Sequence, residues 1–222
     1  MWKQIKGLLS LNKDDLWIAL GMACGPFFLV HLVTNLVMVG IHPRETIMIG
    51  GMVLPFSAGL AAFTVTAGNC QISFSQAVRF GCTRSRARKL VLAMAGILTV
   101  ISTAAAFLLL VFERLCAMPL WRFLSGRPDL LLDDFGFFWW GVPLGAAIGF
   151  LLGLLYAALL LRFGTKGITA WLILWFGGLA MIQVLPWKTH EVTNVLFPAL
   201  GIAAVLAVIW SLRVMGRHCL TK

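Results

Sequence analysis

The chain has 222 residues, of which 60% are hydrophobic and 12% charged, and its formal net charge is +10. Soluble domains carry about 25% charged residues, so this composition excludes a water-facing globular protein. Because a membrane-spanning helix needs about 20 apolar residues, the length accommodates several spans joined by short loops. We therefore expect a single membrane domain over residues 1–222 and no separate soluble domain.

The N-terminal segment, residues 1–13, predicts a short amphipathic helix that lies in the membrane interface. Its apolar residues recur at helical spacing from Trp2 to Leu9, with lysines between them. Asp14 and Asp15 then fall in the first turn of the next helix, where the helix dipole favours acidic side chains.

Long apolar runs make up most of the remaining chain and predict an all-α, polytopic fold with six transmembrane helices. The expected spans are 16–40, 46–68, 90–112, 138–161, 168–187 and 195–213. The longest loops are residues 69–89, after the second span, and 113–137, after the third.

The basic residues predict that both chain ends lie in the cytoplasm. Thirteen of the 18 lysines and arginines fall in segments that this orientation places inside. The five expected outside are Arg44, Arg114, Arg122, Arg127 and Lys188. Six of the eight acidic residues also fall outside. The positive charge is thus explained by topology and by contact with membrane lipid headgroups, and we expect no nucleic-acid partner.

Few polar residues fall within the predicted spans, and none of the lysines, arginines, aspartates or glutamates lies deep in one. This pattern weighs against a proton-driven pump and against an intramembrane enzyme with paired carboxylates. His31 and Asn35 share one face of the first span, and Gln183 lies in the fifth. These three residues either line a substrate path or dimer interface, or form interhelical hydrogen bonds.

A stripe of glycines marks the fourth span. Its members lie four residues apart, on one helix face: Gly141, Gly145, Gly149 and Gly153. Small residues at this spacing let a second helix approach closely. The stripe predicts either packing within the chain or an interface between subunits.

The inside segment 73–89 predicts a short cytoplasmic helix followed by a sharp break. Ser73 and Gln76 have capping-box spacing, Gly81 suits the position after a helix end, and Thr83 can cap the next helix. The segment is either a basic loop that fixes topology or a docking helix for a cytoplasmic partner.

The residues around this break resemble a known family. The sequence Phe80–Gly81–Cys82–Thr83–Arg84 is similar to the G-x-T-R signature of the six-span permease subunits of bacterial type-2 ABC exporters. Arg162–Phe163–Gly164, between the fourth and fifth spans, also resembles that group. One departure is that the long outside loop precedes the fourth span, instead of joining the fifth and sixth as in typical members.

The resemblance implies the membrane-spanning subunit of an ATP-driven exporter of an amphiphilic peptide or lipid, located in the bacterial cell membrane. Residues 73–82 would be the coupling helix that enters a cleft of a cytoplasmic ATP-binding subunit. The docking residues implied are Phe74, Ala77, Val78, Arg79, Gly81 and Arg84. A second permease subunit, identical or a sibling, would complete the transporter.

Catalysis by the chain itself is not expected. It has no G-x-x-x-x-G-K-[ST] phosphate loop, no G-x-S-x-G and no H-E-x-x-H motif, so ATP and Mg²⁺ would bind the partner subunit. The five cysteines form no CxxC pair, and we expect neither a metal site nor a cofactor on this chain. Two alternatives are a six-span substrate-binding component of an uptake system and a stand-alone membrane protein.

Overall fold

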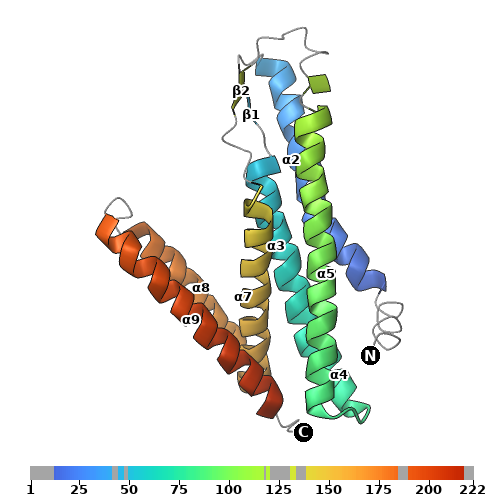
Figure 1. Ribbon diagram of the computed structural model, residues 1–222, viewed down its shortest axis with the longest axis vertical. Helices are drawn as coiled ribbons and strands as arrows, with labels where there is room; N and C mark the ends of the chain where they lie inside the picture. The colour runs from blue at the N-terminus through green and yellow to red at the C-terminus, as the bar shows by residue number, and fades with distance from the viewer. Residues whose placement is uncertain are drawn as a thin grey trace. The chain divides into compact units, whose positions relative to one another are not determined.

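The computed structural model describes residues 13–41, 45–47, 50–117, 119–120, 131–133, 139–184 and 190–217 (Figure 1). The predicted interfacial helix therefore lies almost entirely outside the described residues. The α-helices are α2 (Lys13–Ile41), α3 (Gly50–Gly68), α4 (Phe74–Arg79), α5 (Arg84–Phe112), α7 (Gly141–Phe163), α8 (Lys166–Val184) and α9 (His190–Arg217). The other elements are the π-helices η1 (Asn69–Ser73) and η2 (Glu113–Ala117) and the strands β1 (Glu45–Ile47) and β2 (Leu131–Asp133).

The helical character of a membrane protein is confirmed. Four helical segments are long and apolar enough to cross a bilayer: Lys13–Thr34, Gly50–Arg79, Arg84–Ala117 and Gly141–Phe163. The described side chains of α8 and α9 form shorter apolar stretches, Lys166–Phe176 and Ile202–Met215. Both helices coincide with predicted spans, but the count of six spans stays a prediction.

The chain divides into two compact units, and the first comprises Met1–Val65 and Ala93–Phe150. Its core is a cluster of buried apolar side chains from four helices, including Phe27 of α2, Leu54 of α3, Leu110 of α5 and Val142 of α7. Burial of these side chains against one another holds the four helices together, because apolar area is removed from the surroundings and close packing is gained.

Within this unit, α3 and α7 cross at the glycine stripe. A Cβ atom added to Gly145 would strike the backbone carbonyl of Pro55, and one added to Gly149 would strike that of Gly59. A Cβ added to Gly59 would in turn lie 2.8 Å from the carbonyl oxygen of Gly145. Gly145 and Gly149 thus pack against another helix of the same chain, which was one of the two predictions for the glycine stripe; the other was an interface between subunits. Gly141 is half-buried, and Gly153 is buried in the second unit.

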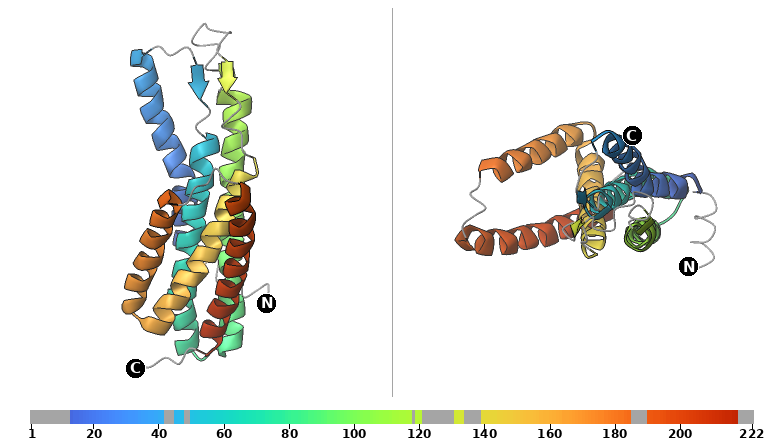
Figure 2. Two further views of the ribbon diagram at one scale, coloured as in Figure 1. Left: turned by 90° about the vertical axis from the view of Figure 1, so that its left-hand side faces the viewer. Right: turned by 90° about the horizontal axis from the view of Figure 1, so that it is seen from above.

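A small parallel strand pair also belongs to the first unit and was not predicted. Figure 2 shows β1 and β2 side by side, with Glu45 opposite Leu131 and Ile47 opposite Asp133. Because Glu45–Ile47 is extended, α3 begins at Gly50, four residues later than the predicted start of the second span.

The second unit comprises Thr66–Leu92 and Leu151–Lys222. In it, α3 continues through η1 into α4 without a break, so the predicted cap at Ser73 is wrong. Ser73 has helical backbone angles (φ −65°, ψ −35°), and its hydroxyl lies 3.3 Å from Oδ1 of Asn69 in a hydrogen bond.

The predicted end of the short helix at Gly81 is confirmed. Gly81 has φ +84°, its N–H donates to the carbonyl of Val78 at 3.1 Å, and the N–H of Cys82 donates to that of Ala77 at 3.0 Å. This pair of bonds is a Schellman motif, which satisfies carbonyl groups left open at a helix end. After it, α5 begins at Arg84, so Thr83 occupies the predicted capping position.

Candidate functional site

A buried carboxylate is the least expected feature of the first unit. α5 ends at Phe112, and the π-helix η2 extends the apolar helical segment to Ala117. Glu113, the first residue of η2, is 0% exposed. Glu113, which was predicted to begin an outside loop, therefore lies in a helical turn and is enclosed by the chain.

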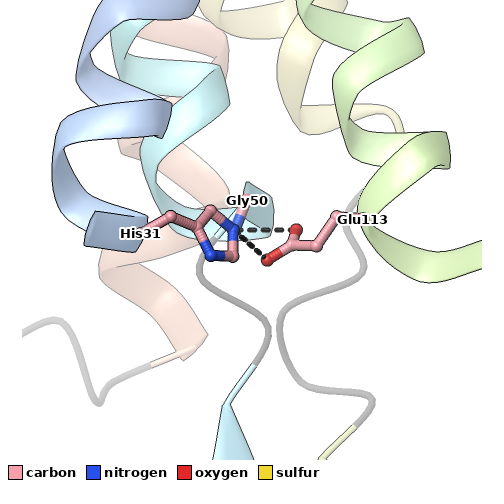
Figure 3. Close-up of polar contacts among 3 residues, drawn as sticks. All are labelled: His31, Gly50 and Glu113. Carbon is pink, nitrogen blue, oxygen red and sulfur yellow. Dashed lines mark hydrogen bonds and ion pairs between the residues drawn. The ribbon is translucent and has the colours of Figure 1, made fainter. Parts of the chain in front are cut away.

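Three segments of the chain meet at Glu113 (Figure 3). The backbone N–H of Gly50, at the start of α3, donates to Oε1 at 3.1 Å and to Oε2 at 2.9 Å. Nε2 of His31, from α2, lies 2.9 Å from Oε1. We call His31, Gly50 and Glu113 the carboxylate cluster.

The helix start explains why a carboxylate fits this position. The first N–H groups of an α-helix have no partner within the helix, and the helix dipole places partial positive charge there. Glu113 satisfies the N–H of Gly50 and complements that charge. Glycine leaves the necessary space, because an added Cβ would strike Oε2 of Glu113 and lie 3.2 Å from the ring of Phe27.

Aromatic packing positions the histidine. The rings of Phe27 and His31 are in edge-to-face contact, with centroids 4.3 Å apart and an interplanar angle of 64°. Phe27 is itself buried in the core of the unit. The imidazole is thus held between an apolar ring and the carboxylate, an arrangement that fixes its orientation.

The cluster joins a buried carboxylate to an imidazole through a hydrogen bond, so it links α2 to the segment that follows α5. Ionisable groups within membrane helices are by default candidates for functional sites. π-Helical turns are also frequent at functional sites. His31 forms a hydrogen bond between two helices, as one of the two predictions for this residue stated. The side chains of Asn35 and Gln183, grouped with it in the prediction, lie outside the described part.

The predicted docking residues lie in the second unit, around α4 and the turn that follows it. Phe74 is 1% exposed, so its side chain packs within the chain and does not lie on the surface where a partner was expected to dock. Ala77, Val78 and Arg84 are half-buried, whereas Arg79 and Gly81 are exposed.

Phe80, which was not among the predicted docking residues, is the prominent side chain of this turn. It is 87% exposed, the highest value among the exposed large hydrophobic residues described. Arg79, Arg86 and Lys89 nearby in the chain are exposed as well. We call Arg79, Phe80, Gly81 and Arg86 the α4 tip. Its signal in the sequence was an aromatic residue directly before a glycine, Phe80–Gly81.

The structure thus offers two sites of different character. The carboxylate cluster contains a fully buried carboxylate, and it joins α2, α3 and η2. The α4 tip is an exposed aromatic side chain in basic surroundings. No family model, curated protein or solved structure matches this chain, so both sites are interpreted from their own geometry and chemistry.

Proposed function

We propose that this chain is the membrane-spanning subunit of an ATP-driven exporter, and that a separate ATP-binding protein docks on the α4 tip. The observation that carries the proposal is the 87% exposure of Phe80. Contact with water is unfavourable for a large apolar side chain at the polar end of a membrane helix. Burial of that side chain in a partner's cleft removes this cost and stabilises the complex.

The basic residues support a protein partner of complementary charge. Arg79 and Arg86 flank Phe80, and both are exposed. Aromatic residues and arginine are both enriched at the centre of protein interfaces. The Schellman turn at Gly81 holds the anchor in a fixed position, which lowers the entropic cost of docking.

The rest of the proposal concerns the membrane. In this proposal, α8 and α9 are the fifth and sixth spans, both chain ends lie in the cytoplasm of a bacterial cell, and a second permease subunit completes the transporter. ATP and Mg²⁺ bind the partner, whose cycle moves the α4 tip. The cargo is an amphiphile, because the chain offers mainly apolar surface to it.

Association with the ATP-binding subunit is the direct test. The full chain, tagged at its C-terminus, is expressed in its native host, extracted in mild detergent and analysed by mass spectrometry. We expect a stoichiometric ATP-binding protein with the wild-type chain. Phe80→Asp should reduce its recovery at least 30-fold, since loss of a hot-spot aromatic residue costs about 2 kcal/mol or more.

Phe163→Asp is the matched control. Phe163 is also an exposed aromatic residue before a glycine with positive φ, at the turn between α7 and α8. This variant should retain normal association. Absence of any ATP-binding protein from the wild-type preparation would refute the proposed function. Full association of Phe80→Asp would refute the docking site alone.

The carboxylate cluster favours one second candidate, a stand-alone carrier driven by protons. Glu113 is buried and is hydrogen-bonded to His31, and chains of acidic residues and histidines form the proton relays of such carriers. In proteoliposomes under a pH gradient, this candidate predicts proton uptake by the purified wild-type chain without ATP. Glu113→Gln would abolish that uptake.

A further inference from the structure

Positive charge gathers at one end of the helices of the second unit. The guanidinium of Arg88, near the start of α5, donates to the backbone carbonyl of Leu212 in α9 at 3.0 Å. The guanidinium carbon of Arg162, near the end of α7, lies 5.6 Å from the ring centroid of Trp210. Arg213, next to Leu212, is exposed. Through these contacts, the start of α5 and the end of α7 both lie close to the C-terminal part of α9.

Within this unit the positive charge has little to balance it. The sequence segments that form the unit contain one acidic residue, Glu191. Glu191 lies in the first turn of α9, whereas Trp210 and Arg213 lie near the other end of that 28-residue helix. An anionic ligand is therefore the natural complement of Arg162 and Arg213.

An apolar stripe on α9 leads directly to this charge. Ile202, Leu206, Ile209 and Arg213 follow one another at intervals of four, three and four residues, so they share one face of the helix. All four side chains are exposed. Three apolar side chains thus lie along α9 next to the basic side chain of Arg213. This arrangement matches a ligand with an anionic head and an apolar tail.

We propose that this face of α9, together with Arg162, binds one anionic phospholipid. The phosphodiester headgroup lies between Arg162 and Arg213, and an acyl chain lies along Ile202, Leu206 and Ile209. Arginine suits the head because its guanidinium presents several donors to phosphate oxygens. Trp210, which lies beside Arg162, is of the residue class that is enriched at headgroup level.

Native mass spectrometry of the full, delipidated chain in detergent tests the site. The probes are dioleoyl-phosphatidylglycerol and dioleoyl-phosphatidylcholine, which have the same acyl chains and differ in headgroup charge. We expect one phosphatidylglycerol molecule to bind more tightly than phosphatidylcholine. Basic residues near anionic lipid contribute roughly a fivefold gain in affinity each, so Arg162→Gln with Arg213→Gln should weaken binding about 30-fold.

Two control variants separate a specific site from diffuse attraction. Arg79→Gln with Arg86→Gln removes the same charge from the α4 tip and should leave lipid affinity within twofold of wild type. Replacing Arg162 and Arg213 by lysine keeps the charge and should restore most of the affinity lost with glutamine. Restoration by lysine also shows that the glutamine variant lost charge and not its fold.

Three results would overturn the proposal. Equal affinity for the two lipids would remove the headgroup selectivity, and an equal loss in the α4-tip control would reduce the effect to net charge. Full displacement of the lipid by inorganic phosphate at equal concentration would indicate an anion site without an acyl-chain contribution. None of these results depends on whether an ATP-binding subunit docks on the α4 tip.

Discussion

Replacing Glu113 by alanine should destabilise the first unit by about 3 kcal/mol. The carboxylate is fully buried, accepts the backbone N–H of Gly50 with both oxygens and pairs with His31. Loss of the carboxylate leaves the N–H of Gly50 without its acceptor, and a hydrogen bond to a charged group contributes about 1.5–3 kcal/mol. The contact with His31 adds about 0.6 kcal/mol, the average for polar contacts between membrane helices.

Glu113→Gln should cost less, about 1 kcal/mol. The glutamine carbonyl oxygen can still accept the N–H of Gly50, and its amide group can donate to a neutral His31. The loss is then the difference between a charged and a neutral acceptor, which is about 1 kcal/mol for a single hydrogen bond. The order of the two variants separates lost hydrogen bonding from lost charge.

The free energy of unfolding in mixed detergent micelles, followed by circular dichroism, measures both effects. Cys116→Ala is the control, because Cys116 lies in the same π-helix with an exposed side chain, and it should stay within about 0.5 kcal/mol of wild type. A double-mutant cycle with His31→Ala should give a coupling of about 0.6–1.7 kcal/mol. Stability of Glu113→Ala equal to wild type would show that the carboxylate does not hold the helices together.

Two glycines give further predictions for the same unfolding assay. Gly149→Ala should lose about 1–3 kcal/mol because its Cβ would strike the carbonyl of Gly59, whereas Gly96→Ala, with nothing within 4 Å, should be neutral or stabilising. Equal effects would contradict the close helix crossing. Gly81→Ala should lose about 1–2 kcal/mol at φ +84°, and Gly81→Asn less, because asparagine tolerates the left-handed region better than alanine. No loss in Gly81→Ala would mean that the turn adopts another conformation in solution.

Hydropathy predicted the helices well because membrane-spanning backbone has few alternatives to a helix. Each of the six apolar runs coincides with one helix, and α5 extends its run at the N-terminal end, where it begins at Arg84. The boundaries that differ depend on partners distant in the sequence. The start of α3 at Gly50 follows from the pairing of Glu45–Ile47 with residues 131–133, which local sequence cannot reveal.

In residues 73–84, local sequence correctly predicted where the helix ends but not which side chains are exposed. Gly81 ends the helix for a reason that is local, namely its tolerance of positive φ. The family resemblance implied that Phe74 and Val78 dock on a partner, which requires both side chains to be exposed. Since α4 continues from η1, Phe74 is buried within the chain, and the exposed aromatic residue is Phe80.

The burial of Glu113 could not be predicted either, because it depends on contacts with residues distant in the sequence. An acidic residue at the end of a long apolar run indicates the point where a span meets water, provided that the helix ends there. Here η2 continues the helical segment, and the carboxylate meets an N–H 63 residues away in sequence and a histidine 82 residues away. The sequence contained each component, but nothing in the spacing of His31, Gly50 and Glu113 brings them together. An acid that borders an apolar run is therefore a topology marker only when no helix N-terminus and no basic side chain can reach it.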